Sequence, residues 1–234
     1  KSLAEITKDA ANAFIDGVLT ASNNGNVRVA VVQYGTYAKA YQFTSDNWTN
    51  GWSSGLTVDG DNVYVSDNAK AKEAVNNATT RFSKDSDGGT NTEGGFLMAS
   101  KVADAARNGA EKVVIFMTDG MPTYRYSGNS VESDSHWFWG GGGTQTSKQE
   151  LNEAIEAAQN LSKYGDIYTI ALLSAFEDDG NEAKLANYLL STSPKEYISD
   201  NDKRDIMPHV NKDNRWESTV GYAQKYYPIF SNVN

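Results

Sequence analysis

Apolar side chains recur at spacings of three and four residues in several parts of the chain, and this pattern predicts amphipathic helices. The segments that carry it are residues 2–19, 68–82, 96–107, 147–165 and, for a shorter helix, 181–190. Two of these segments open with a capping box, in which a serine and a glutamate bond to each other's backbone N–H groups. The boxes are Ser2-Leu3-Ala4-Glu5 and Ser147-Lys148-Gln149-Glu150.

Apolar runs between these helices predict strands. Residues 27–32, 112–117 and 167–173 are apolar with little alternation, which is typical of strands covered on both faces. Residues 38–43 alternate and follow the first run across Gly35-Thr36, so we expect a hairpin there. Residues 226–230 predict a last edge strand, because proline is tolerated at sheet edges.

Strands and helices that alternate along the chain predict an α/β fold, with a mostly parallel sheet and helices on both faces. A length of 234 residues allows one large domain or two small ones. We expect a single domain over residues 1–234. Two polar, aromatic stretches predict long loops, at residues 45–66 and 123–146.

Composition and charge exclude several classes of function. Apolar residues make up 39% of the chain and aromatic residues 11%, enough for a sizeable core. The net charge is −9, from 21 basic and 30 acidic residues, without any block of basic residues. Affinity for a phosphate backbone comes from lysine and arginine, so we expect no nucleic-acid partner. No apolar run approaches the ~20 residues that span a bilayer, so we expect no membrane insertion.

Candidate catalytic groups are few. The chain has no cysteine, which removes thiolate nucleophiles, disulfides and cysteine-based zinc sites. Gly51-Trp52-Ser53-Ser54-Gly55 matches the Gly-x-Ser-x-Gly pattern, but such an elbow needs a strand before it and a helix after it. The two histidines, His136 and His209, both fit solvated loop positions. We therefore expect that the protein is not an enzyme.

Two segments could hold a metal ion. Asp119 follows the apolar run 112–117, and Thr90 belongs to a glycine-rich loop that leads into a helix. Ligands of open α/β sheets gather outside the carboxyl ends of the strands. Hydroxyl and carboxylate oxygens there would suit Mg²⁺ or Mn²⁺. The same residues also fit a simple turn at Asp119-Gly120 and a helix cap at Thr90, and the spacing does not decide between the two interpretations.

These two segments resemble the von Willebrand factor type A family. The relevant motifs are Gly88-Gly89-Thr90-Asn91-Thr92 before a helix and Thr118-Asp119-Gly120-Met121-Pro122 after a strand. In particular, they are similar to bacterial cell-surface and pilus-tip adhesins, over residues 1 to about 190. The resemblance implies a doubly wound sheet and a metal-ion-dependent adhesion site, in which Thr90 and Asp119 match the family's threonine and second aspartate. The implied cofactor is Mg²⁺ or Mn²⁺, with Ca²⁺ as a further candidate.

The sequence departs from this family at both ends. The family's first strand carries Asp-x-Ser-x-Ser, which supplies the other metal ligands and the centre of the sheet, and these 234 residues contain no such triplet. The family's final helix has no counterpart before residue 234. Two strands without their central neighbour would leave backbone groups unpaired, at roughly 1–3 kcal/mol each. We expect either that the remainder of a larger surface protein supplies this strand or that the chain departs from the family sheet.

The resemblance implies a secreted adhesion module at the cell surface or cell wall, which binds a carboxylate of a host or surface-protein ligand. Aromatic side chains of the two long loops would contact that ligand, although each could instead pack its loop onto the domain. They are Trp48, Trp52, Trp137, Phe138 and Trp139. A structural pilin or surface-scaffold module with an incomplete metal site is the alternative, and an intracellular chelatase-type or regulatory subunit is a third.

Overall fold

The computed structural model describes residues 3–20, 25–82, 89–118, 122–133 and 148–171. This part of the chain is a mixed α/β structure, as the alternating pattern predicts. Its helices are α1 (Leu3–Thr20), α2 (Gly60–Val63), α3 (Asn68–Phe82), α4 (Thr92–Asp104) and α5 (Lys148–Leu161). Its strands are β1 (Val32–Tyr34), β2 (Ala38–Gln42), β3 (Asn47–Trp48), β4 (Val113–Thr118), β5 (Arg125–Ser127), β6 (Ser130–Glu132) and β7 (Asp166–Ala171).

The strands form three small sheets within the described residues. Strands β1, β2 and β3 are antiparallel neighbours in that order, and β5 and β6 form a hairpin. Strands β4 and β7 run parallel, with Val113 opposite Asp166 and Thr118 opposite Ala171. A parallel pair connected through α5 agrees with the predicted fold class. One doubly wound sheet that joins all these strands stays a prediction.

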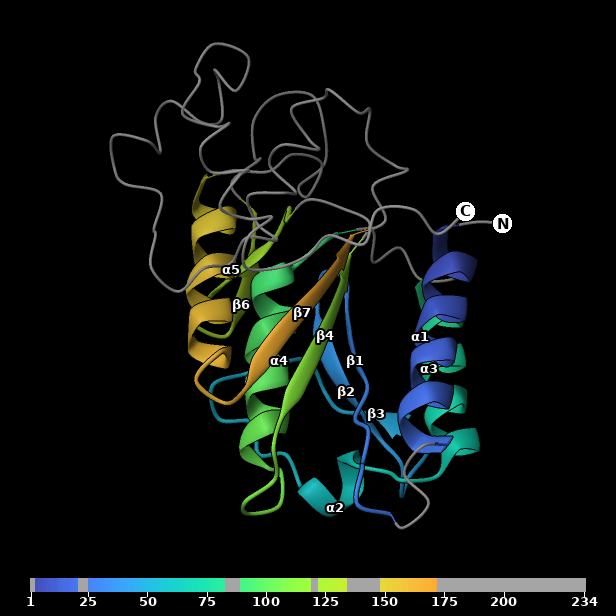
Figure 1. The fold of residues 1–234 in the computed structure, drawn as a ribbon. Helices are drawn as coiled ribbons and strands as arrows, with labels where there is room; N and C mark the ends of the chain where they lie inside the picture. The colour runs from blue at the N-terminus through green and yellow to red at the C-terminus, as the bar shows by residue number, and fades with distance from the viewer. Residues whose placement is uncertain (1–2, 21–24, 83–88, 119–121, 134–147, 172–234) are drawn as a thin grey trace, which may run out of the picture.

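Helices lie on both sides of the strands (Figure 1). Helices α1 and α3 pack together on one side, where Ile15 and Leu19 contact Ala71 and Val75. Helix α4 covers the other face of the β1–β2 pair, and α5 lies beside α4 (Figure 1). The three-stranded sheet is therefore the middle layer of this part of the structure.

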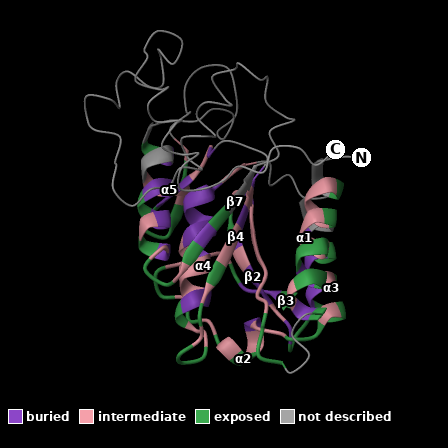
Figure 2. Cartoon of the chain, in the orientation of Figure 1, coloured by how far each residue is buried: buried purple, intermediate pink, exposed green. Residues whose placement is uncertain are grey.

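Helix α4 packs against both larger sheets. Met98 and Val102 contact Ala38 and Ala40 of β2. Phe96 and Ala103 lie in a second cluster, whose other buried members come from β4, β7 and α5: Phe116, Ile167, Ala157, Ala158 and Leu161. Figure 2 shows the resulting band of buried residues along α4. Because α4 is buried against both sheets, its position relative to the β1–β2–β3 sheet and the β4–β7 pair is fixed.

A side chain, and not a strand pairing, connects β1 to β4 in the described residues. The Tyr34 hydroxyl of β1 donates to the Met117 carbonyl of β4 at 2.8 Å. The Tyr34 ring stacks on Phe116 with 5.8 Å between centroids. Neighbouring strands of one sheet lie about 4.8 Å apart and bond through their backbones, and β1 and β4 belong to different sheets.

The first predicted strand lies later in the chain than expected. We predicted residues 27–32, but β1 begins at Val32 and runs to Tyr34. The reason is a change of partner along the segment: Val29 forms an isolated bridge with Val65, in which each residue's N–H donates to the other's carbonyl at 2.7 and 2.9 Å. Ladder pairing with β2 begins only after that bridge.

Both predicted loops contain regular structure. Residues 45–66 include β3, the short helix α2 and the bridge residue Val65. The part of residues 123–146 that the structure describes, 123–133, holds the β5–β6 hairpin, whose two-residue turn begins at Gly128 with a φ of 62°. Gly-Asn between two strand-like runs is a hairpin signal, because the glycine adopts positive φ without strain.

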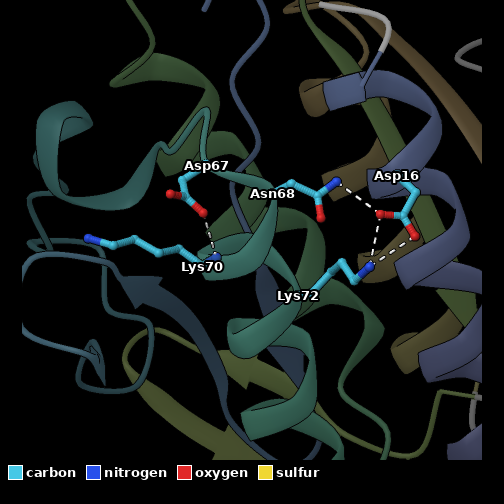
Figure 3. A network of polar contacts seen from close by, with 5 residues as sticks. All are labelled: Asp16, Asp67, Asn68, Lys70 and Lys72. Carbon is cyan, nitrogen blue, oxygen red and sulfur yellow. Dashed lines mark hydrogen bonds and ion pairs between the residues drawn. The ribbon is translucent and has the colours of Figure 1, made fainter.

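The contact between α1 and α3 is reinforced on the surface by a polar network (Figure 3). The Lys72 ammonium donates to both carboxylate oxygens of Asp16, at 2.9 and 3.0 Å, and the Asn68 amide donates to one of them at 3.0 Å. These bonds lower the pKa of Asp16, the Lys72 bond most. Asp67 accepts the Lys70 N–H at 3.0 Å in the first turn of α3.

The predicted helix at 181–190 and the predicted strand at 226–230 lie outside the described residues. Within the described residues, none of the helices has the length and apolar character needed to cross a bilayer.

Candidate functional site

Thr90 lies directly beside the chain that follows β4. Its N–H donates to the Thr123 hydroxyl at 2.9 Å, and its carbonyl accepts the Thr123 N–H at 2.8 Å and the Tyr124 N–H at 3.2 Å. Thr118 ends β4 and is buried. The loop before α4 therefore meets the segment after β4, at the carboxyl end of that strand.

Asn91 joins this loop to the turn between β1 and β2. Its N–H donates to the Gly35 carbonyl at 2.7 Å, and its side-chain Nδ2 donates to the Thr36 carbonyl at 3.1 Å. Its Oδ1 accepts the Gly94 N–H at 2.8 Å, which makes Asn91 the N-cap of α4. Asn91 is fully buried, so one side chain fixes the start of α4, the Thr90 loop and the β1–β2 turn together.

The N-cap explains why α4 begins at Thr92, four residues before the predicted start at 96. The glycines at 94 and 95 lowered the expected helix propensity, yet both sit where other side chains approach closely. A Cβ on Gly94 would lie 2.7 Å from the Tyr126 ring, and one on Gly95 would lie 3.0 Å from the Tyr34 ring. The two glycines are needed for packing, and the cap and burial offset their cost.

Gly89 allows close contact between the loop before α4, the β1–β2 turn and the segment after β4. A Cβ at this position would collide with the Tyr124 ring and would lie 2.9 Å from the Thr36 hydroxyl. The backbone of the glycine-rich loop thus runs between the β1–β2 turn and the segment after β4. The convergence of three segments at one end of the strands follows from these contacts.

Of the two predicted metal ligands, the structure describes Thr90 but not Asp119. Thr90 lies at the meeting point just described, partly exposed. Asp119 lies outside the described residues, between Thr118, which ends β4, and Pro122. The described residues therefore bring Thr90 beside Thr123, which follows Asp119 closely in the sequence, and the distance between the Thr90 and Asp119 side chains stays a prediction.

The oxygen atoms available near Thr90 are of the kind that bind hard cations such as Mg²⁺. Hydroxyl groups come from Thr90 and Thr36, and Asp119 would add a carboxylate. Among the residues that the structure describes, no group of three or more acidic or histidine side chains is arranged to hold a metal ion. Any cation here would therefore depend on Asp119, water and ligands from beyond the described residues.

The predicted ligand-contact aromatics occupy different environments. Trp48 is 7% exposed and packs edge-on against Tyr41, with 5.1 Å between ring centroids. Trp52 is half-buried, and its ring packs against Tyr126 with 4.7 Å between ring centroids. Both rings pack their loop onto the domain, one of the two roles that the sequence allowed. Trp137, Phe138 and Trp139 lie outside the described residues, and ligand contact by any of the five stays a prediction.

A buried carboxylate near Thr90 was not singled out from the sequence. Glu93 is 7% exposed, and its Oε2 accepts the Tyr126 N–H at 2.6 Å. The pKa of Glu93 is raised from 4.5 to about 7, mainly by burial and to a smaller extent by Glu153 and Glu156. The Tyr126 N–H and Arg125 act in the opposite direction.

The positive charge near Glu93 belongs to the β5–β6 hairpin. Arg125 is buried and forms an ion pair with Glu132 across the hairpin, at 3.2 Å. Glu150 of α5 is also fully buried. From the sequence, Glu93 belonged to the glycine-rich loop before the predicted helix at 96–107, and an acidic residue is ordinary near a helix N-terminus. Its burial depends on β5 and α5, which residue spacing does not locate.

No known protein family matches the chain, and no curated protein matches it. A solved structure that is similar to it is the pilus adhesin SpaC from Lactobacillus rhamnosus GG, at 18% sequence identity and a TM-score of 0.48. The similarity covers 95% of this chain and 28% of that chain.

Proposed function

We propose that this chain is an extracellular ligand-binding module of a surface adhesin, with a divalent-cation site built on Thr90 and Asp119. The observation that carries the proposal is the bonding of Thr90 to Thr123 and Tyr124, because these two residues follow Asp119 closely in the sequence. The resemblance of both motifs to the von Willebrand factor type A family supports it. In that fold the site lies on a doubly wound sheet.

The residues of this chain would position the site and recognise the partner. Thr90 and Asp119 would hold Mg²⁺ or Mn²⁺ through hydroxyl and carboxylate oxygens. Asn91 keeps the Thr90 loop in place through its bonds to Gly35, Thr36 and Gly94. When bound, the cation supplies an open coordination position for a carboxylate oxygen of the partner.

A binding assay tests this function. A synthetic peptide with one aspartate, Gly-Asp-Gly-amide, is immobilised through its N-terminal amine, and retention of the chain is measured in MgCl₂ and in EDTA. We expect retention in MgCl₂ only, and loss of retention in Asp119→Ala. Asp61→Asn is the matched control, because Asp61 is exposed on α2, away from Thr90. Retention that is equal with and without the cation would contradict the proposal and would favour the scaffold alternative.

We also propose that a strand from the remainder of a larger surface protein lies between β1 and β4. The support is the absence of pairing between these strands in the described residues, where the Tyr34 side chain bridges them. Hydrogen exchange tests this point. The amides of Val32 and Ile115 should exchange slowly in the parent protein and much faster in the 234-residue chain. Equal protection in both would contradict the added strand.

A further inference from the structure

Tyr37 is a strongly exposed aromatic residue at the same end of the molecule as Thr90. It lies in the turn between β1 and β2, and 48% of its surface is exposed. The other strongly exposed large apolar side chains of the described residues lie within α1 or β7, before β1 or β7, or at the first residue of β4, and these three strands run toward Thr90. They are Val27, Val113, Tyr164, Phe14 and Tyr168. Tyr37 therefore differs from these side chains because it lies in the turn next to the Thr90 loop.

Backbone bonds fix the turn that carries Tyr37, and Gly51 covers part of its ring. The Gly35 N–H donates to the Tyr37 carbonyl at 3.1 Å and closes the turn. The ring lies over Gly51, where a Cβ would come within 3.4 Å of Tyr37 Cδ1. The next residue, Trp52, donates its N–H to the Ala38 carbonyl at 3.0 Å. A tyrosine held in this way loses little conformational entropy when it binds a partner.

The turn that carries Tyr37 is attached to the Thr90 loop. Asn91 donates to the carbonyls of Gly35 and Thr36, the two residues that precede Tyr37. The Thr36 hydroxyl approaches Gly89, the residue before Thr90. The exposed ring and the candidate metal loop therefore belong to one connected group of contacts at the surface.

We propose that Tyr37 is a partner-contact residue of this site and that its ring packs against an apolar side chain next to the partner's carboxylate. The proposal rests on the proposed function and names the class of partner: a peptide segment in which an aspartate or glutamate is flanked by large apolar residues. An exposed, rigid aromatic ring gains binding energy by burying such a side chain. The carboxylate alone would provide no contact for the ring.

Two synthetic peptides test the inference by calorimetry with the 234-residue chain in MgCl₂. They are acetyl-Gly-Asp-Gly-amide and acetyl-Phe-Asp-Phe-amide. We expect the second to bind the unmodified chain about tenfold more tightly, which is a common effect of one aromatic contact. Tyr37→Ala should remove this difference and leave binding of the glycine peptide unchanged, whereas Tyr37→Phe should retain it. Tyr164→Ala is the matched control, because Tyr164 is an exposed tyrosine before β7, at the opposite end.

The thermal unfolding midpoint of each variant shows whether its fold is intact. If Tyr37→Ala lowers the unfolding midpoint strongly, Tyr37→Thr takes its place, since threonine suits a position next to a strand. An unchanged preference for the phenylalanine peptide in the Tyr37 variants would overturn the inference. So would equal affinity of the unmodified chain for the two peptides.

The experiment separates this inference from the proposed function. If the chain shows no effect of MgCl₂ or of Asp119→Ala, the metal-dependent function fails. In that case the phenylalanine peptide is titrated in EDTA: binding that Tyr37→Ala weakens still supports the contact role, and binding that it leaves unchanged overturns it. If cation-dependent binding of the glycine peptide is present and the Tyr37 variants change nothing, only the inference about Tyr37 fails.

Discussion

The Glu93 carboxylate accepts the Tyr126 N–H at 2.6 Å and so connects the first turn of α4 to β5. This bond lies in a buried environment that also contains Arg125 and faces Glu153 and Glu156 of α5. The Glu93 side chain thus stabilises the fold as a hydrogen-bond acceptor, whereas its negative charge destabilises the fold because it is buried. The net effect on stability depends on pH.

Stability should fall as pH rises through the range in which Glu93 ionises. The pKa of Glu93 is raised from 4.5 to about 7 in the folded chain. The folded state therefore binds more protons than the unfolded state between these values, and stability is lost as pH rises through the folded pKa. Glu93→Gln should remove this slope and stabilise the chain at pH 8 by at most about 3 kcal/mol.

Urea denaturation at a series of pH values measures this effect. Glu111→Gln is the control, because Glu111 is exposed on the loop before β4. The control should retain the slope of the unmodified chain. A Glu93→Gln variant that keeps the same slope would show that another group titrates there.

Alanine substitutions at two glycines should have opposite effects. Gly17→Ala, on the exposed side of α1, places a Cβ where no heavy atom lies within 4 Å. It should stabilise the chain by about 0.5–1 kcal/mol, because alanine favours the helix. Gly94→Ala directs a Cβ to 2.7 Å from the Tyr126 ring, and such overpacking should cost about 1–3 kcal/mol. Thermal unfolding compares the two, and equal effects would refute the close packing of α4 against β5.

Replacement of Asn91 should remove two side-chain connections at once. Asn91→Ala keeps the backbone bond to the Gly35 carbonyl but leaves the Gly94 N–H and the Thr36 carbonyl with fewer partners, so we expect a loss of about 2–4 kcal/mol. Asn91→Asp keeps the acceptor for Gly94 but loses the donor to Thr36, and should cost less than alanine. Chemical denaturation ranks the variants. An aspartate variant as unstable as the alanine variant would indicate that the amide donor, and not the cap, is the main contribution.

The ion pair between Asp16 and Lys72 should give a small stabilisation that depends on salt and pH. The lowered pKa of Asp16 means that its contribution is present above the unfolded pKa and is lost as pH falls through the folded pKa. A double-mutant cycle with Asp16→Asn and Lys72→Met measures the coupling. We expect coupling at low salt and at neutral pH that disappears at high salt, because the pair is at the surface. Coupling that persists at high salt would contradict a simple surface pair.

The sequence predicted local elements well where a periodic pattern and a clear boundary coincided. Helices α1 and α3 follow their apolar stripes closely, and the run at 112–117 became β4, shifted by one residue. The start of α4 was missed because the glycines at 94 and 95 reduce helix propensity, and only the approach of Tyr126 and Tyr34 explains their presence. Propensity is local, whereas that approach is tertiary.

At the candidate site, too, the sequence predicted local features but not tertiary contacts. The motif around Thr90 indicated a loop at the end of the sheet, and the structure places Thr90 beside Thr123. No residue spacing indicated that Trp48 would lie in the core against Tyr41, since a tryptophan among polar residues suits a surface loop equally well. The roles of Asn91 and Glu93 also depend on partners distant in sequence, namely Thr36 and Tyr126.

Titration of MgCl₂ into the chain by calorimetry tests the central claim most directly. The account predicts saturable binding by the unmodified chain, with a rise in unfolding temperature as MgCl₂ exceeds its Kd. Thr90→Val, which removes one hydroxyl and keeps the side-chain shape, should weaken this binding, and Asp119→Ala should abolish it. Binding of equal strength in all three proteins would contradict a cation site on Thr90 and Asp119, as would the absence of binding in the unmodified chain.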